Sequence, residues 1–321
     1  MNILLTGAAG FIGSHLADYL LSRGARVVAV DNFATGREEN IREARASENF
    51  VFYEADVNNR VEVEKIFGSR RFDTVFHFAA QTGVIRTQED PLSVLEDLNG
   101  IRNILELSAA SGVGRVVFSS SSEVYGDPAE VPIAEDGVIC PGLTYAAVKF
   151  MGEKFLEGYY RARGLNYSCL RFFNVYGPRQ NSSPYGFVVG IFIEQALTGK
   201  PLTIFGDGSA TRDFTYVDDA VRGALLAAES GSANTEIINI GTGVRTSIKE
   251  LAEKIIKATG SDSLPEYLPP RENDIMHRLA DITKMDKILR HTPAVDLEEG
   301  LTFTAEWYRD RLKKEVQQSV Y

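Results

Sequence analysis

Tyr145 and Lys149 stand four residues apart in a stretch that predicts a helix, so their side chains share one face. A nearby ammonium stabilises a tyrosinate, which lets a phenol act as a base closer to neutral pH. A run of serines reaches Ser121 at the end of a predicted strand, and Glu123 follows it. A hydroxyl at that strand end can bridge the same substrate oxygen. A Tyr-Lys pair alone is usually a chance surface pair, and the elements around this one favour proton transfer.

The N-terminus predicts a binding site for a dinucleotide. An apolar strand, Asn2–Thr6, leads into a turn with glycines at positions 7, 10 and 13, and a helix-like stretch follows from Ser14 to Arg23. Glycines lack a Cβ, so the backbone N–H groups can approach a pyrophosphate, and the helix dipole favours its charge. Asp31 closes the second strand about 20 residues later, where a carboxylate binds an adenosine ribose and repels a 2′-phosphate. No arginine follows directly, so NAD is favoured over NADP.

Strand-like and helix-like runs alternate through the first half of the chain. The strand-like runs are apolar with little polar alternation, as expected of strands that helices cover on both faces. This order predicts right-handed crossovers and an α/β fold with a doubly wound parallel (Rossmann) sheet. The expected strands are Arg26–Val30, Phe50–Glu54, Thr74–Phe78, Arg115–Ser119 and Tyr167–Arg171, and the expected helices are Val61–Phe67, Leu92–Ala110 and Tyr145–Arg163.

The pattern changes after Asn174, where Gly and Pro signals predict loops. We expect residues 1–174 to form the NAD-binding domain and residues 175–321 a smaller mixed α/β lobe for the substrate. Segments near 210–242 are expected to return to the sheet. The elements expected in this half are helices Val188–Leu197, Val217–Ala228, Ser247–Ala258, Thr283–Leu289 and Glu298–Arg311, and strands Leu202–Phe205 and Glu236–Asn239.

Composition narrows the class of protein further. The 321 residues are 44% hydrophobic, enough for one large core or a core with a smaller lobe. A net charge of −10 and the lack of a Lys/Arg-rich run argue against a nucleic-acid partner. Cys140 and Cys169 lack metal-ligand spacing and are expected to be buried thiols, so no metal is expected. No apolar run reaches about 18 residues and no signal-peptide pattern is present, so the expected location is the cytoplasm.

Several motifs together resemble the extended short-chain dehydrogenase/reductase family. They are Thr6-Gly-Ala-Ala-Gly-Phe-Ile-Gly13, Phe78-Ala-Ala80, Val124-Tyr-Gly126, the Tyr145/Lys149 pair and Arg171-Phe-Phe-Asn-Val-Tyr-Gly-Pro178. Within that family the chain is most similar to NAD-dependent nucleotide-sugar epimerases and dehydratases. The resemblance implies that Ser121 and Tyr145 contact the sugar hydroxyl that is oxidised. It also implies that these residues contact NAD: Gly7, Gly10, Phe11, Ile12, Gly13, Asp31, Asn32, Asp56, Val57, Ala79, Tyr145 and Lys149.

The second half resembles the family's clamp for a nucleotide diphosphate. This resemblance rests on Asn174, Leu202-Thr-Ile-Phe-Gly-Asp-Gly208, Arg212-Asp-Phe214, Arg271 and Asp274. Arg212 and Arg271 can each offer a planar, permanently charged fork to a diphosphate. Asp274 is placed to accept a hydrogen bond from the ribose of the nucleotide. An acidic protein can therefore contain a locally basic cleft, and a UDP-sugar is the expected substrate.

Members of this group share a first step, in which tyrosinate takes the proton of the sugar 4-OH and NAD takes a hydride from C4. The 4-keto sugar is then reduced on its other face, loses water or loses CO₂. Dehydratases typically have an Asp-Glu pair where this chain has Ser122 and Glu123, which disfavours dehydration. Glu123 is typical of uronate decarboxylases, but Phe187 stands where those enzymes tend to have an arginine. Uronate 4-epimerases often have Thr at the position of Asn174 and an arginine at that of Asn181.

Two further departures from the family pattern concern charged residues. Arg278 lies near the position that often gates the sugar pocket, where it could meet a phosphate or a carboxylate. Asp97 stands where the family usually has Asn; either an Asp lies near the nicotinamide or the register is shifted by one helical turn.

The preferred interpretation is an NAD-dependent 4-epimerase of a UDP-hexose. In it Tyr145 is the base, Lys149 lowers the pKa of that tyrosine, Ser121 bridges the 4-OH and Glu123 lines the pocket. The alternatives are a UDP-glucuronate decarboxylase or a UDP-glucuronate 4-epimerase, with a 4,6-dehydratase or a non-catalytic NAD sensor less favoured. By the same resemblance, helices Leu92–Ala110 and Tyr145–Arg163 pair with a second copy, so a homodimer is expected.

Overall fold

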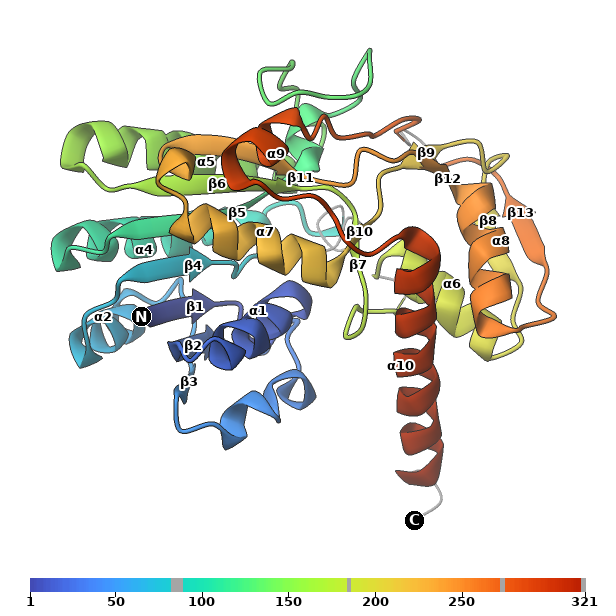
Figure 1. The fold of residues 1–321 in the computed structure, drawn as a ribbon, viewed down its shortest axis with the longest axis horizontal. Coiled ribbons are helices and arrows are strands. Elements are labelled where there is room, and N and C mark those ends of the chain that lie inside the picture. Colours follow the sequence, from blue (N-terminus) through green and yellow to red (C-terminus); the bar gives the residue numbers. More distant parts are fainter. Residues whose placement is uncertain (82–88, 184–185, 272–274, 319–321) are drawn as a thin grey trace.

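A seven-stranded parallel sheet forms the centre of the protein (Figure 1). The computed structural model describes residues 1–81, 89–183, 186–271 and 275–318. The sheet has the order β11-β6-β5-β4-β1-β2-β3, and every neighbouring pair is parallel. This confirms the predicted doubly wound sheet. Its strands are β1 (Asn2–Thr6), β2 (Arg26–Asp31), β3 (Phe50–Glu54), β4 (Thr74–His77), β5 (Arg115–Ser121), β6 (Tyr167–Phe172) and β11 (Glu236–Ile240).

Helices cover both faces of this sheet, which explains why its strands are apolar throughout. One face packs against α1 and α7, and the other against α2, α4 and α5. α4 and α5 both end where a glycine, Gly112 or Gly164, takes the left-handed conformation that closes a helix. The helices are α1 (Phe11–Ser22), α2 (Arg60–Ser69), α4 (Asp97–Ser111), α5 (Thr144–Arg163) and α7 (Val217–Glu229).

The structure differs from the sequence prediction in a few places. α1 begins at Phe11 rather than Ser14, because Gly10 already takes the extended N-cap conformation. The helix expected over Leu92–Ala110 is divided into a 3₁₀ turn, η3 (Ser93–Glu96), and α4. Cys169 is buried as expected, but Cys140 is exposed, because it lies in a loop and not in a packed element.

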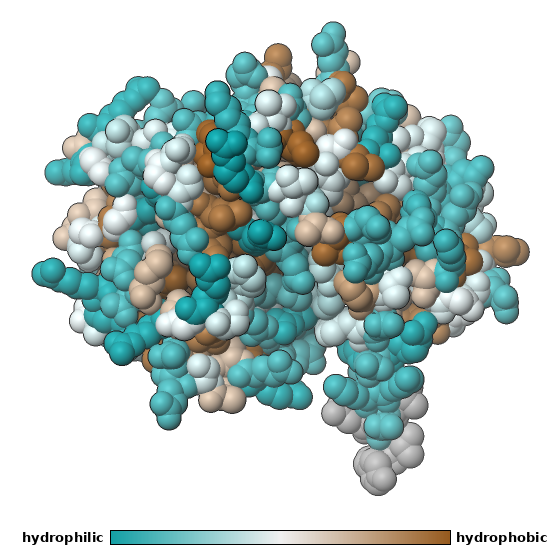
Figure 2. Space-filling view, in the orientation of Figure 1, coloured by the Kyte–Doolittle hydropathy of each residue, from teal (hydrophilic) through white to brown (hydrophobic). Residues whose placement is uncertain are grey.

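A smaller group of elements lies at one end of the sheet, with α6, α8 and α10 side by side (Figure 1). α8 begins with a capping box between Ser247 and Glu250. The surface of α10 is largely hydrophilic in Figure 2. The longer elements of this group are α6 (Val188–Leu197), β8 (Leu202–Phe205), α8 (Ile248–Thr259), β13 (Pro265–Leu268) and α10 (Leu297–Gln318), whereas α9 (Thr283–Leu289) packs against β11 and α7. The short strands are β7 (Val175–Tyr176), β9 (Thr211–Arg212), β10 (Thr215–Tyr216) and β12 (Thr246–Ser247).

The two parts of the chain share one hydrophobic core. β11 and α7, which follow the first lobe elements in sequence, pack on β6 and α1. A single cluster of buried apolar side chains runs from Leu16 of α1 through Val217 of α7 to Ile255 of α8 and Leu301 of α10. No helix within the described residues is long and apolar enough to cross a membrane.

The close packing of α5 on the sheet gives a test of the fold. A Cβ at Gly152 would lie 2.5 Å from Cζ of Phe118 on β5, whereas Gly158 on the same helix has nothing within 4 Å. Gly152→Ala should therefore lower the free energy of unfolding by about 1–3 kcal/mol through overpacking. Gly158→Ala, the matched control, should raise it by about 0.5–1 kcal/mol. Urea unfolding measures both, and equal effects of the two substitutions would contradict the packing described.

Candidate active site

The glycine turn between β1 and α1 is a backbone cradle with no room for side chains. A Cβ at Gly13 would lie 2.0 Å from the carbonyl oxygen of Gly7, and one at Gly7 would lie 2.7 Å from the Ala79 nitrogen. Gly7 also has a φ of +72°, which a residue with a side chain rarely adopts. No side chain caps the start of α1. The first N–H groups of α1 are therefore available to an anion.

Hydrogen bonds from β1 and β2 fix the shape of this cradle. The hydroxyl oxygen of Thr6 accepts from the Phe78 and Ala79 N–H groups at 3.2 Å each, which joins β1 to the residues after β4. The carboxylate of Asp31 accepts from Ala9 N–H at 2.9 Å and from Phe33 N–H at 2.8 Å. β1 and β4 are neighbours where the strand order reverses, which is where ligands bind in doubly wound sheets.

The remaining residues expected to contact NAD follow β2, β3 and β4 at the same edge of the sheet. The Asn32 side chain donates to the Asp56 carboxylate at 3.3 Å, so the loops after β2 and β3 meet there. Asp56 also accepts from the Asn58 N–H at 2.8 Å. Val57 is buried, and Ala79 is partly buried. The structure therefore brings these residues together beside the cradle.

Tyr145 and Ser121 meet at the carboxyl end of β5. Ser121 is the last residue of β5 and accepts from the Glu123 N–H, which caps the 3₁₀ turn η4 (Ser122–Tyr125). Its side chain is also hydrogen-bonded to Tyr145 in the first turn of α5. Lys149 lies one turn further along α5, with its ammonium 5.7 Å from the centre of the Tyr145 ring.

The pKa of Tyr145 is raised by the surroundings of this side chain in the fold. Burial and the negative charge of Glu123 raise it above its ordinary value, and the hydrogen bond from Ser121 lowers it only in part. That Lys149 lowers this pKa stays a prediction, because the groups with the largest effects on it are Glu123, Ser121 and Asp97. The Lys149 ammonium donates to the Ser119 carbonyl at 2.6 Å and stands over the Phe118 ring. Burial destabilises the charged tyrosinate by more than the hydrogen bond from Ser121 stabilises it.

Asp97 is a further negative group near Lys149. It begins α4, and its carboxylate accepts from the Gln81 N–H at 2.9 Å. Burial raises the pKa of Asp97, and the Lys149 charge opposes that rise. Burial lowers the pKa of Lys149 to about 8, and the Asp97 charge opposes that shift in turn. Asp97 therefore helps to keep the buried ammonium protonated.

A cleft of about 700 Å³ opens close to Tyr145 and Ser121 and extends into the lobe. Tyr145 and Ser121 are not among its lining residues. Leu143, two residues before Tyr145, and Glu123, two residues after Ser121, do line it. The sequence-predicted substrate residues that line it are Asn174, Arg212, Arg271 and Arg278. Asp274 lies outside the described residues.

An ion pair between Arg278 and Glu123 lines the cleft, and the Glu123 charge acts on nearby Tyr145. Arg278 also donates to the Gly126 carbonyl at 2.8 Å. Its side chain is almost fully buried, and its Nε has no hydrogen-bond partner within the described part of the chain. Glu123 is partly exposed to the cleft. The positive charge of Arg278 is thus neutralised in the protein alone.

The opposite part of the cleft is lined by arginine and aromatic side chains. The guanidinium of Arg271 lies over the ring of Phe205, 3.9 Å from its centre. Arg212 lies on β9 and donates to the Thr211 carbonyl. Asn174, with an unusual φ of +24°, donates to the Asp213 carbonyl at 3.2 Å. The sequence motifs contained Phe205 but gave it no role, although its strand position facing the lobe's arginines could have indicated one.

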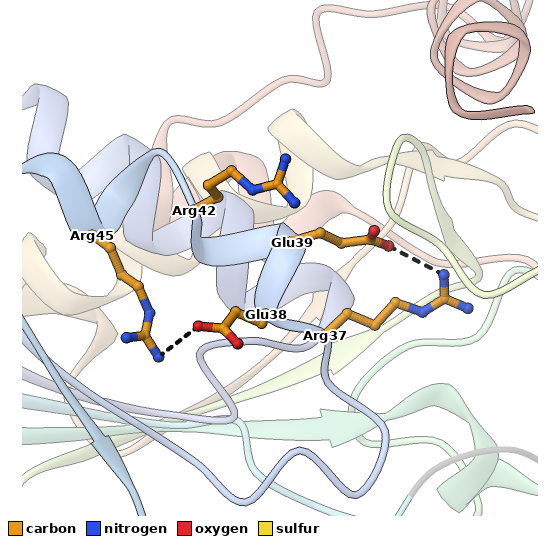
Figure 3. Close-up of a pocket in the computed structure, with 5 residues that line it drawn as sticks. All are labelled: Arg37, Glu38, Glu39, Arg42 and Arg45. Atoms are coloured by element: carbon orange, nitrogen blue, oxygen red, sulfur yellow. Dashed lines mark hydrogen bonds and ion pairs between the residues drawn. The ribbon is translucent and has the colours of Figure 1, made fainter. Parts of the chain in front are cut away.

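A second hollow lies on the 3₁₀ segments η1 (Glu38–Ile41) and η2 (Ala44–Ala46), after β2 (Figure 3). Its lining residues are Arg37, Glu38, Glu39, Arg42 and Arg45. Arg37 pairs with Glu39 at 3.2 Å and Arg45 with Glu38 at 3.4 Å, so most of its charge is neutralised. None of the sequence-predicted site residues lines this hollow, so the cleft is the candidate active site.

Comparisons with known proteins agree on a family but not on a reaction. A model of the NAD dependent epimerase/dehydratase family matches residues 3–241. The chain is 39% identical over 313 residues to a UDP-glucose 4-epimerase of Mycolicibacterium smegmatis, covering 97% of this chain and 99% of that protein. It is 38% identical over 320 residues to a UDP-N-acetyl-alpha-D-glucosaminuronate decarboxylase of Bacillus cytotoxicus, covering 96% and 97%. A crystal structure of UDP-glucose 4-epimerase from Thermotoga maritima, with UDP-glucose, superimposes with a TM-score of 0.92 at 41% identity, covering 97% and 100%.

The buried ammonium of Lys149 predicts a pH dependence of stability. Its pKa is about 8 in the folded protein and 10.5 ordinarily, so between these values the unfolded chain binds more protons at this residue. Stability attributable to Lys149 is then fully present above pH 10.5 and is lost as the pH falls through about 8. The free energy of unfolding of the wild type minus that of Lys149→Met should rise by about 3 kcal/mol across this window. Denaturant unfolding of NAD-free protein measures it, and a constant difference would contradict the prediction.

Proposed function

Because the chain belongs to the NAD dependent epimerase/dehydratase family, we propose that it is a 4-epimerase of a UDP-hexose. The observation that supports this most directly is the hydrogen-bonded Tyr145–Ser121 pair beside Lys149, next to a cleft that ends in arginines. The UDP-glucose 4-epimerases among its relatives match over nearly the whole chain.

NAD is the cofactor of this family, and the glycine cradle fits its diphosphate. Side chains at Gly7 and Gly13 would fill the space that the cradle leaves, and the uncapped start of α1 offers N–H donors. Asp31 is placed to accept from the adenosine ribose, while Asn32, Asp56, Val57 and Ala79 line the adjoining edge. Bound NAD supplies an acceptor for the hydride of the sugar C4 and a donor for its return.

The side chains of this site would handle the sugar proton. Tyr145 would act as the tyrosinate, after its own proton has left: its oxygen takes the proton of the sugar 4-OH and later returns it, while the Ser121 hydroxyl bridges the same oxygen. The ammonium of Lys149 lies 5.7 Å from the centre of the Tyr145 ring, where its positive charge would favour the tyrosinate over the phenol. Tyr145 is therefore the base, and Lys149 and Ser121 hold its proton in reach of the sugar.

A neutral sugar fits the charge balance at the inner end of the cleft. Glu123 already neutralises Arg278, so the protein offers no excess positive charge where a sugar C6 group would lie. Ser122, the neighbour that would have to act as an acid in a dehydration, is a buried hydroxyl instead of a carboxyl group. At the other end of the cleft, Arg212 and Arg271 would hold the diphosphate of the substrate. Phe205 would lie beside the nucleotide base.

A turnover assay with a single-oxygen variant tests this proposal. Purified protein should interconvert UDP-glucose and UDP-galactose without added NAD, as followed by NMR. Tyr145→Phe should lower kcat by about 1,000-fold or more, because it removes the atom that carries the proton. Tyr160→Phe makes the same change on the exposed side of α5 and should keep wild-type kcat. Activity retained in Tyr145→Phe would refute the mechanism.

The second candidate is a decarboxylase or 4-epimerase of a UDP-uronate, and one observation favours it. Nε of Arg278 has no partner within the described residues, and the side chain lines the cleft. A uronate carboxylate could take that donor if Glu123 were protonated or displaced. The relative from Bacillus cytotoxicus is a decarboxylase by name. Loss of CO₂ from UDP-glucuronate in mass spectra, with no turnover of UDP-glucose, would replace the first proposal by this one.

A homodimer through α4 and α5 is also part of the proposed function. Met151 and Phe155 lie one turn apart on α5 and are each about two-fifths exposed, and Leu95 before α4 is half exposed. Apolar side chains gathered on one face of a soluble enzyme indicate an interface. Light scattering should give about twice the 35.4-kDa mass of the chain, and Phe155→Glu should shift it towards 35.4 kDa. A wild-type mass of 35.4 kDa at micromolar concentration would contradict the dimer.

A further inference from the structure

A buried polar network lies beneath the edge of the sheet where Tyr145 and Ser121 meet. Its centre is the ion pair between Glu153 of α5 and Arg171 of β6, with side chains 0% and 2% exposed. Arg171 donates from Nε and Nη2 to the two oxygens of Glu153, at 2.9 and 2.7 Å. Ser120 of β5 donates to the same carboxylate at 2.5 Å. One carboxylate thus joins two adjacent strands to a helix.

This network extends to the 3₁₀ turn η4 through Tyr125. Arg171 Nη1 donates to the Tyr125 hydroxyl oxygen at 2.8 Å, and that hydroxyl donates to Asn239 of β11 at 2.6 Å. The Asn239 amide donates in turn to the Ile133 carbonyl at 2.9 Å. The Arg171 guanidinium also stands over the Tyr125 ring, 4.7 Å from its centre. All the hydrogen-bonding atoms are buried or nearly so, which makes the network strongly directional.

The residues at each end of the network are close in sequence to residues of the candidate active site. Glu153 follows Lys149 by four residues and Tyr145 by eight, so all three lie on the sheet-facing side of α5. Ser120 directly precedes Ser121, and Tyr125 closes the same 3₁₀ turn as Glu123. These connections link α5, which contains Tyr145, to β5, which ends at Ser121.

The Arg278 segment is tied to the same network. Ile133, whose carbonyl accepts from Asn239, bridges to Ala280, and its N–H donates to the Leu279 carbonyl at 2.8 Å. Leu279 is the next residue after Arg278. The network therefore supports both partners of the Glu123–Arg278 pair, one through Tyr125 and the other through Asn239.

Stability alone is a weak reason for such a pair. Taking two charges out of water costs free energy that their attraction often only balances, and well-packed apolar residues commonly replace buried ion pairs without loss. A bidentate Arg–carboxylate pair does, however, fix relative orientation more tightly than apolar packing does. Geometry, rather than added stability, is then the contribution that distinguishes this pair.

We propose that Tyr125, Glu153 and Arg171 are positioning residues that set the spacing between Ser121 and Tyr145. They are not among the residues that line the cleft, and they act through α5, β5 and η4. A displacement of these elements by a fraction of an ångström would move the tyrosine oxygen relative to the serine hydroxyl that shares its proton. The kinetic part of this proposal rests on the proposed function, whereas its geometric part does not.

Tyr125→Phe tests the proposal with the loss of a single oxygen. The ring and its packing stay, so the protein should fold, while the bridge from Arg171 to Asn239 is lost. We expect kcat to fall by about 10-fold, with KM for the UDP-sugar and the amount of bound NAD unchanged. A crystal structure of the variant should show the Ser121 and Tyr145 oxygens moved out of hydrogen-bond distance. Wild-type kcat, or reduced kcat with an unchanged Ser121–Tyr145 hydrogen bond, would overturn the proposal.

The double variant Glu153→Met, Arg171→Met separates positioning from stability. Apolar side chains of similar length remove both charges together, so neither is left buried and alone. If the folded double variant melts near the wild-type temperature, kcat should be about 100-fold lower, and an unchanged kcat would overturn the proposal. If it does not fold, Tyr125→Phe decides. Glu157→Gln, which breaks the two surface ion pairs to Lys154 and Arg161 one turn further along α5, should leave all readouts unchanged.

Crystal structures of the wild type and of Tyr125→Phe would test this proposal independently of the proposed function. If wild-type protein turned over none of the UDP-sugars, the epimerase proposal would fail. The comparison of the Ser121–Tyr145 spacing in the wild type and in Tyr125→Phe would still confirm or overturn the role of the network.

Discussion

The contact between the start of α1 and the turn before it is the constraint on which the rest of the site depends. Gly13 lies so near the Gly7 carbonyl that any larger residue would push α1 away from β1. α1 packs in turn on α7, and the His15 ring is hydrogen-bonded to the Pro178 carbonyl at 3.0 Å. The backbone contact in the glycine turn thus also helps to fix the position of the loop after β7.

Burial and nearby charges together determine the pKa of Tyr145. Glu123 and Asp97 are negative, Lys149 and Arg278 are positive, and the phenol of Tyr145 lies among them. Burial, Glu123 and Asp97 all raise the pKa of this tyrosine, and the hydrogen bond from Ser121 opposes them only in part. The protein alone therefore stores the tyrosine as a neutral phenol. A change in the charges around this phenol, such as an added positive charge, would lower its pKa again.

Local patterns in the sequence were sufficient for the elements and for the residues that lie close together along the chain. The Tyr145–Lys149 spacing, the glycine turn and the apolar strands are local signals, and the parallel sheet follows from their alternation. The Glu123–Arg278 pair joins residues 155 positions apart, and the pattern of neither segment contains that contact. The rise in the Tyr145 pKa through burial could not be read from the sequence for a related reason. A helix spacing of four shows that an ammonium is near, but the depth of burial depends on the whole fold.

The position of β11 has a consequence for how the chain is made and cut. β11 lies outside β6 in the sheet, although some 60 residues separate them in sequence and part of the lobe comes between. A fragment that stopped at Asn174 would leave β6 as a bare edge strand and would uncover the sheet face beneath α7. The sheet can therefore be completed only after the chain has been synthesised as far as Ile240, the end of β11. For the same reason, we expect that limited proteolysis after Asn174 would not yield a stable N-terminal fragment.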